Sequence, residues 1–145
     1  MGLLEGKVVV VTGAGGGLGR EHALAMAKEG AKLVVNDLGG ARDGTGGGTA
    51  MADKVAEEIK SAGGEAVANY DSVASVEGAN NIVKTAVDAF GQLDICVNNA
   101  GILRDKTLSK LDEGMWDSVI AVHLKGTYCV SRAAFNHMKE RGGGA

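Results

Sequence analysis

Five glycines packed between Gly13 and Gly19 are the residues with the clearest chemical potential in this sequence. They follow an apolar run at 8–11 and precede a segment with the composition of a helix. Strand, glycine turn and helix in this order build a phosphate site, because glycine permits a sharp turn and free N–H groups at the helix start attract an anion. The spacing Gly-x3-Gly-x-Gly differs from the usual Gly-x-Gly-x-x-Gly, but it still supplies a tight turn and a close approach. The predicted phosphate-binding residues are Gly13, Gly16, Gly17, Leu18 and Gly19.

Asp37 is the next candidate, 18 residues after Gly19 and directly after the apolar run Lys32–Asn36. A carboxylate at this place can accept hydrogen bonds from both hydroxyls of an adenosine ribose, and it would repel a 2′-phosphate. Positions 16 and 38 hold no cation, and Arg42 lies in a glycine-rich stretch. The sequence therefore favours NAD over NADP as the cofactor, although an aspartate after a strand can also serve only as a turn residue.

Two later segments place polar groups after further strand-like runs. Asp71 could bind the amino group of adenine, whereas an Asx turn or a helix cap would also explain an aspartate there. The stretch 98–101, Asn-Asn-Ala-Gly, suits a loop that closes over a ribose, but this is also ordinary turn composition. The candidate cofactor-binding residues in these two segments are Asp71, Ser72, Asn98, Ala100 and Gly101.

Alternating strand-like and helix-like segments must position these groups. Strands are expected at 7–11, 32–36, 66–69 and 93–97, and helices at 18–29, 50–61, 76–90 and from 112 to about 141, with a loop at 102–110. Helices between continuous apolar strands indicate a parallel sheet that is covered on both faces. The expected fold is α/β, an incomplete Rossmann-type doubly wound sheet with about four strands in the order 3-2-1-4 and four helices over residues 1–145. The apolar side of the last helix should contain Trp116, Val119, Ile120, Leu124, Tyr128 and Phe135.

Composition excludes several classes of protein. The chain has 145 residues, 45% of them hydrophobic, and a formal net charge of −3, which suits one domain and gives no electrostatic basis for nucleic-acid binding. No apolar run approaches a membrane span, and the first residues lack a secretory signal, so we expect a cytoplasmic protein. Cys96 and Cys129 are interpreted as free, buried thiols, and no histidine has a ligand-spaced partner, so no metal site is expected.

Together, the glycine turn, the acids after the second and third strands and the Asn-Asn-Ala-Gly loop resemble the short-chain dehydrogenase/reductase family over the whole chain. The segments 36–40, 68–73, 101–105 and 122–126 are similar to a narrower group, the (3R)-hydroxyacyl-CoA dehydrogenase domains of the peroxisomal multifunctional enzymes of β-oxidation and their bacterial relatives. This resemblance implies NAD-linked oxidation of a (3R)-hydroxyacyl-CoA to the 3-ketoacyl-CoA. It also implies an acyl-CoA or other small hydroxy or keto substrate, a homodimer or homotetramer, and a peroxisomal location if the source is a eukaryote.

The family's reaction uses Asn, Ser, Tyr and Lys, and the resemblance puts His123 at the position of the Asn, as in the narrower group. His123 is therefore a candidate catalytic residue in a proton relay, or a histidine that only packs and hydrogen-bonds on a helix. Tyr128 and Arg132 have the Tyr-x3-basic spacing, but arginine does not titrate, so Tyr128 is expected in the core or an interface. The Ser, Tyr and Lys are expected beyond residue 145, which makes this chain the inactive N-terminal part of the domain. The alternative is a non-catalytic nucleotide-binding or interaction protein that ends at residue 145.

Overall fold

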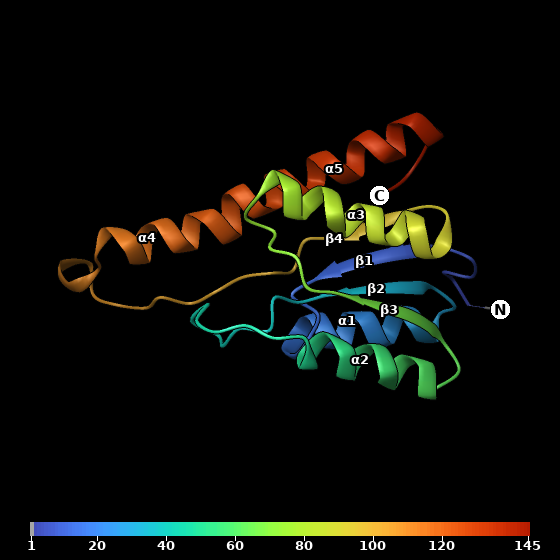
Figure 1. The fold of residues 1–145 in the computed structure, drawn as a ribbon, viewed down its shortest axis with the longest axis horizontal. Coiled ribbons are helices and arrows are strands. Elements are labelled where there is room, and N and C mark those ends of the chain that lie inside the picture. Colours follow the sequence, from blue (N-terminus) through green and yellow to red (C-terminus); the bar gives the residue numbers. More distant parts are fainter. Residues whose placement is uncertain (1) are drawn as a thin grey trace.

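A four-stranded parallel sheet forms the centre of the molecule (Figure 1). The computed structural model describes residues 2–145, and Met1 lies outside the described residues. The strand order is β3-β2-β1-β4, which confirms the predicted order and the Rossmann-type fold. The strands are β1 (Val8–Thr12), β2 (Lys32–Asn36), β3 (Glu65–Asn69) and β4 (Ile95–Val97), and the α-helices are α1 (Gly17–Lys28), α2 (Ala50–Ser61), α3 (Val76–Phe90), α4 (Glu113–Ile120) and α5 (Gly126–Arg141).

Helices cover both faces of the sheet, with α1 and α2 on one side and α3 and α5 on the other (Figure 1). The side chains of β1 alternate between these layers, because successive residues of a strand point to opposite faces. Val8 and Val10 pack with α3 and α5, whereas Val9 and Val11 pack with α1 and α2. Every residue of β1 is buried, as expected for a central parallel strand that reads as a continuous apolar run.

The apolar side predicted for the last helix is exposed in this chain. Trp116, Leu124, Tyr128 and Phe135 are all more than half exposed, so Tyr128 is not a core residue. The buried face of α5 lies in the same core as α3 and contains Cys129, Val130, Ala134 and Met138, while Gly126 lies against Val73. A π-helical segment, Ala121–Lys125, joins α4 to α5 and breaks the regular α-helical periodicity.

Smaller differences concern the bounds of the elements. The strand expected at 93–97 is only Ile95–Val97, and the Asp94 carboxylate before it accepts the Val8 N–H at the start of β1. The region 102–110, expected as a loop, contains a short 3-10 helix at Leu108–Lys110. Ala145 lies along the outer side of β4, where its N–H donates to the Asp94 carbonyl and its carbonyl accepts from the Cys96 N–H, both at 2.8 Å.

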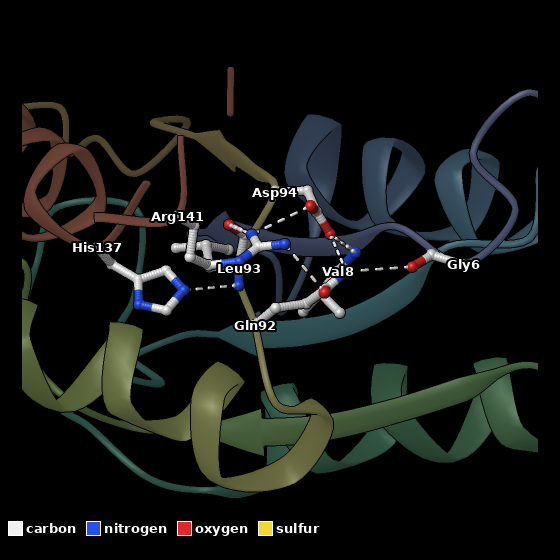
Figure 2. A network of polar contacts seen from close by, with 7 residues as sticks. All are labelled: Gly6, Val8, Gln92, Leu93, Asp94, His137 and Arg141. Atoms are coloured by element: carbon white, nitrogen blue, oxygen red, sulfur yellow. Dashed lines mark hydrogen bonds and ion pairs between the residues drawn. The ribbon is translucent and has the colours of Figure 1, made fainter. Parts of the chain in front are cut away.

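The amino-terminal edge of the sheet is closed by a polar network around Asp94 (Figure 2). Its Oδ2 accepts hydrogen bonds from the Val8 N–H at 2.8 Å and from Gln92 Nε2 at 2.7 Å. Its Oδ1 pairs with Arg141 Nη1 at 3.2 Å, so the end of α5 is joined to the start of β1. Burial alone would raise the pKa of Asp94, but the bonds from Val8, Arg141 and Gln92 together hold that pKa below its usual value.

The same network fixes the segment before β4. Arg141 Nη1 also donates to the Leu93 carbonyl at 2.9 Å, and Nη2 donates to Gln92 Oε1 at 3.0 Å. His137 Nε2 accepts the Leu93 N–H at 3.2 Å (Figure 2). Both polar backbone groups of Leu93 therefore have side-chain partners from α5, and this edge of the sheet offers no free donors to a ligand at that position.

Candidate functional site

A groove of about 620 Å³ lies at the opposite, carboxyl edge of the sheet. Ligands of doubly wound sheets bind at this edge, where the strand order reverses between neighbouring crossovers. Here the reversal falls between β1 and β4, because β2 and β3 extend to one side of β1 and β4 lies on the other. Most of the cofactor-binding residues predicted from the sequence line this groove: Gly13, Gly16, Gly17, Asp37, Asp71, Ser72, Ala100 and Gly101.

The start of α1 leaves its backbone donors without a protein partner. Its N-cap is Gly16, no side chain caps the helix, and its first turn contains no acidic residue. By contrast, Ser75 caps α3 and Asp112 caps α4, each through a side-chain oxygen that accepts a backbone N–H. The first N–H groups of an α-helix need an acceptor, and the helix dipole favours an anion there. The start of α1, which includes Leu18 with its exposed side chain, therefore fits a phosphate group.

Two glycines bring the turn, the helix and the loop after β4 into close contact. Gly13 has a φ of +63°, and a Cβ built there would lie 2.8 Å from the Ala100 Cα. A Cβ on Gly19 would lie 2.3 Å from the Gly13 carbonyl oxygen and 2.4 Å from Asn99 Nδ2. These distances exclude any larger residue without movement of the backbone. Gly19 therefore lies directly against the start of the glycine turn and the loop after β4.

Asn99 and Thr12 fasten the loop after β4 to the glycine turn. Asn99 Nδ2 donates to the carbonyls of Thr12 and Gly13, at 3.0 and 3.1 Å. Thr12 Oγ1 in turn accepts the N–H groups of Asn99 and Ala100, both at 3.1 Å. Asn99 lines the groove but was absent from the predicted site residues, since a carboxamide in a loop carries no signal of which backbone it will hold. Asn98 points away from this clamp and donates to Ser131 Oγ at 3.0 Å.

The carboxylate of Asp37 joins the glycine turn to the segment after β2. Its Oδ2 accepts the Gly15 N–H at 2.8 Å, and its Oδ1 accepts the Gly39 N–H at 2.7 Å. The bond to Gly39, two residues on, is the turn that the sequence offered as the alternative role of Asp37. Each carboxylate oxygen can accept a second hydrogen bond, so both remain able to bind hydroxyl groups from the groove.

Asp71 is held by side chains rather than by a backbone turn. Asn69 Nδ2 donates to its Oδ2 at 2.8 Å, and Asn81 Nδ2 donates to its Oδ1 at 3.2 Å. The helix-cap interpretation of Asp71 is wrong, because Ser75 caps α3. Ser72 closes a short turn by accepting the Ala74 N–H at 3.1 Å. Asp71 therefore faces the groove with its carboxylate fixed from behind.

His123 lies on the π-helical segment, beside the loop after β4. Its Nε2 is 2.9 Å from the carbonyl oxygen of Ile102 and 3.0 Å from its N–H nitrogen. Gly101 provides the space for the ring, because a Cβ there would lie 2.6 Å from His123 Cε1. His123 itself is exposed and does not line the groove, but it holds Gly101 and Ile102, which do.

A glycine-rich segment between β2 and α2, residues 38–49, reaches across to the loop after β4. The Leu103 N–H donates to the Arg42 carbonyl at 2.9 Å, and a Cβ on Gly44 would lie 3.0 Å from Ile102 Cδ1. Arg42 and Gly44 also line the groove. The sequence marked this segment only as a loop, because a single backbone hydrogen bond between two irregular segments leaves no periodic pattern.

Thiol and metal chemistry have little support at this site. Cys96 and Cys129 are free cysteines, and burial raises the pKa of Cys96 to about 11, which leaves it a poor nucleophile near neutral pH. Within residues 2–145, no cluster of three or more His, Cys, Asp or Glu side chains could hold a metal ion. Over the same residues, no helix has both the length and the apolarity needed to cross a membrane.

Comparison with known proteins gives consistent family matches. Residues 7–145 match the short chain dehydrogenase family. The chain is 61% identical over 135 residues to the peroxisomal multifunctional enzyme A of Dictyostelium discoideum, which covers 93% of this chain and 30% of that protein. It is 41% identical over 138 residues to the hydroxyacyl-CoA dehydrogenase ChsB1 of Mycobacterium tuberculosis, which covers 95% of this chain and 42% of that protein. The chain thus spans less than half the length of these curated relatives.

Solved structures show the same fold. A short chain dehydrogenase from Mycobacterium avium superposes with a TM-score of 0.87 at 49% identity, over 99% of this chain and 50% of that one. A 7α-hydroxysteroid dehydrogenase complexed with NADH and 7-oxo glycochenodeoxycholic acid gives a TM-score of 0.86 at 29% identity, over 97% of this chain and 51% of that one.

Proposed function

Because this chain belongs to the short-chain dehydrogenase family, we propose that its groove binds NAD and that it forms the cofactor-binding part of an oxidoreductase acting on (3R)-hydroxyacyl-CoA. The observation that carries this proposal is the start of α1, which no side chain caps. It lies beside the glycine turn, and neither Gly13 in the turn nor Gly19 in the helix has room for a side chain. Free helix donors beside a glycine cradle fit the pyrophosphate of a dinucleotide.

The remaining groups of the groove fit an adenosine on one side of that pyrophosphate. The carboxylate of Asp37 has acceptor capacity left for the two ribose hydroxyls, and Asp71 offers a carboxylate for the amino group of adenine. The nicotinamide end would then extend toward Ala100, Gly101 and the segment that His123 holds. In this arrangement the three parts of the dinucleotide would follow one groove along the carboxyl edge of the sheet.

The choice of NAD over NADP depends on Asp37. A 2′-phosphate would place negative charge beside a carboxylate that two backbone N–H groups hold in the groove. Arg42 also lines the groove, and it is the one feature that would favour NADP. We favour NAD because Asp37 is fixed at the end of a buried strand, whereas Arg42 belongs to the irregular segment 38–49.

The proposed reaction belongs to the longer proteins that this chain resembles. Bound NAD accepts a hydride from the carbon that carries the substrate hydroxyl. This chain would orient the dinucleotide, and His123 would hold the loop beside the nicotinamide through the Ile102 backbone. A proton relay through His123 stays a prediction; since Nε2 is engaged with Ile102, it would need the other ring nitrogen or release of that contact. The (3R)-hydroxyacyl-CoA substrate is proposed from the resemblance and from the relative that is named a hydroxyacyl-CoA dehydrogenase.

Titration calorimetry with NAD and NADP of a full-length protein that contains this chain tests the cofactor proposal. We expect NAD to bind at least about tenfold more tightly than NADP, as the loss of a charge-assisted hydrogen bond and an added repulsion would produce. Equal affinities would contradict the assignment of Asp37, and binding of neither dinucleotide would contradict the function. Reduction of NAD by a full-length protein with (3R)-hydroxybutyryl-CoA, followed at the NADH absorbance band, tests the reaction. A homodimer or homotetramer, and a peroxisomal location in a eukaryotic source, remain expectations for such a full-length protein.

A further inference from the structure

Two buried asparagines that the proposed function does not use lie at the adenosine end of the groove, and Asn36 is part of the groove's lining. Asn36 and Asn69 are only 2% and 5% exposed, and they face each other at the last paired position of β2 and β3. Asn36 Nδ2 donates to Asn69 Oδ1 at 2.8 Å. A buried carboxamide is costly unless its hydrogen bonds are satisfied, so the partners of this pair decide what it stabilises.

The orientation of the Asn69 side chain follows from its partners. Its Oδ1 lies 3.0 Å from the Asp71 N–H, and a backbone N–H can only donate. The opposite atom is therefore the amide nitrogen, which donates to Asp71 Oδ2 at 2.8 Å and to Thr85 Oγ1 at 2.9 Å. All four hydrogen bonds of this carboxamide are made, and a flipped side chain would place an acceptor against the carboxylate of Asp71.

Asp71 is thereby fixed at its backbone as well as at its carboxylate. Asn69 accepts its N–H, and Asn36 Nδ2 donates to its carbonyl at 2.9 Å. Asn69 and Asn81 each donate to one carboxylate oxygen. Both contacts to the carboxylate donate to it, one to each oxygen, so each oxygen keeps capacity to accept a further hydrogen bond.

We propose that Asn69, supported by Asn36, is a positioning residue that makes Asp71 select a 6-aminopurine over a 6-oxopurine in the dinucleotide. A fixed carboxylate can accept the amino hydrogen of adenine, whereas the carbonyl oxygen of hypoxanthine at the same place would repel it. A free carboxylate could rotate away and lose this discrimination. The inference rests on the proposed dinucleotide site and names how one part of that site reads its ligand.

Direct binding of two dinucleotides separates this role from a merely structural one. The probes are NAD and nicotinamide hypoxanthine dinucleotide, titrated by calorimetry into a full-length protein that contains this chain and into its Asn69→Ala variant. The wild type should prefer NAD by about tenfold or more, the size expected of one hydrogen bond to a charged group. Asn69→Ala should bring the two affinities to within about threefold, chiefly by weakening NAD. General loss of structure would weaken both dinucleotides equally and leave the ratio unchanged.

Two further variants serve as controls, one for a general loss of stability and one for the case in which Asn69→Ala does not fold. Val55→Ala removes a buried side chain from the layer between α2 and the sheet, so it should lower the melting temperature without changing the ratio. Asn81→Ala removes the second donor to Asp71 from an exposed position and should lower the preference for NAD even if Asn69→Ala fails to fold.

The outcomes distinguish this inference from the function on which it rests. A reduced ratio in Asn69→Ala supports it, and where Asn69→Ala does not fold, a reduced ratio in Asn81→Ala supports the positioning of Asp71. If the wild type binds NAD and a folded Asn69→Ala keeps the wild-type ratio, the positioning role is overturned while the dinucleotide site stands. If the wild type binds neither probe, both proposals are overturned together.

Discussion

The two ends of the same strands have opposite polar character. At the amino edge, the start of β1 and the segment before β4 are joined by Asp94, Gln92 and Arg141, whose polar groups bind one another (Figure 2). At the carboxyl edge, β1 runs into a glycine turn and a helix start that no side chain caps. One edge therefore uses its hydrogen bonds for stability, and the other leaves donors free beside a groove.

This difference shows how one scaffold can separate stability from binding. Breaking the amino edge should lower stability and leave the groove's affinity intact, since the network lies at the far ends of the strands from the groove. Changing the glycine turn or the uncapped start of α1 should chiefly lower the groove's affinity for its ligand.

Asp94→Ala should give the largest change, in stability. It leaves the Val8 N–H without its acceptor and Arg141 without its carboxylate, and breaking a partly buried pair of this kind costs about 3 kcal/mol. Urea unfolding followed by circular dichroism measures the free energy of unfolding, and calorimetry with NAD serves as the control at the other edge. If Asp94→Ala is fully folded under the conditions of the titration and still binds NAD more weakly, the two ends of the strands do not act separately.

Gly19→Val should give the largest change in binding. Its Cβ would overlap the Gly13 carbonyl oxygen, so the start of α1 must move away from the turn. We expect NAD affinity to fall by about a hundredfold, as misplacement of the phosphate donors by an ångström can cause. Gly114→Val, at an exposed site on α4, is the matched control. Unchanged NAD affinity in Gly19→Val would place the phosphates elsewhere.

Asp37→Ala should alter the choice of cofactor more than the affinity for NAD. Loss of its hydrogen bonds to the ribose and of its repulsion of a 2′-phosphate should reduce the ratio of NADP to NAD dissociation constants by about ten- to a hundredfold. Asp37→Asn keeps the shape and removes the charge, so a similar result there would identify charge as the cause. If both variants retain the wild-type ratio, Asp37 acts only as a turn residue.

His123→Ala should have a smaller effect that appears in kcat of a full-length enzyme. Without the ring, Gly101 and Ile102 lose their contact with the π-helical segment, while the phosphate and adenosine contacts remain. Steady-state kinetics should show a lower kcat with nearly unchanged NAD affinity, and His123→Asn should recover part of the loss. Identical kcat and melting temperature in both variants and the wild type would show that the contact is dispensable.

The pH dependence of stability should show the smallest effect. The folded pKa of Asp94 lies below its unfolded value of about 3.9, so its contribution is fully present above that pH and is lost as the pH falls through the folded pKa. The free energy of unfolding should therefore decline below about pH 4, and less steeply in Asp94→Asn. Equal slopes in that range would mean that other carboxylates dominate acid unfolding.

Most of the fold could be predicted because it is encoded in local patterns. The valines of β1 and the alternation of strands and helices indicated the sheet, and the expected range 50–61 for α2 matches the structure. The buried face of the last helix could not be predicted in this way, since the π-helical segment shifts the register and the small residue Ala134 lies in the core shared with α3. The large apolar residues Trp116 and Phe135 lie on the exposed side of that helix.

The candidate site divides in the same manner. Gly13, Asp37 and Asp71 could be proposed from their types and their places after strands, and the structure brings them to one groove. The side chains that hold these residues in place could not be predicted. Asn69 and Asn99 act through contacts with Asn36 and Thr12, which lie far from them in the sequence. Nothing in a single sequence distinguishes such an asparagine from one in an ordinary turn.

The π-helical segment Ala121–Lys125 makes the length of the last helix a functional quantity. A π-helical turn holds one more residue than an α-helical turn, so removing one residue from it would restore regular α-helical hydrogen bonding while α4 and α5 keep roughly their relative orientation. The turn that carries His123 would then tighten, and its ring would move relative to the Ile102 backbone. In this stretch, a deletion that regularises the helix should spare the packing of α5 and disrupt the contact between His123 and Ile102.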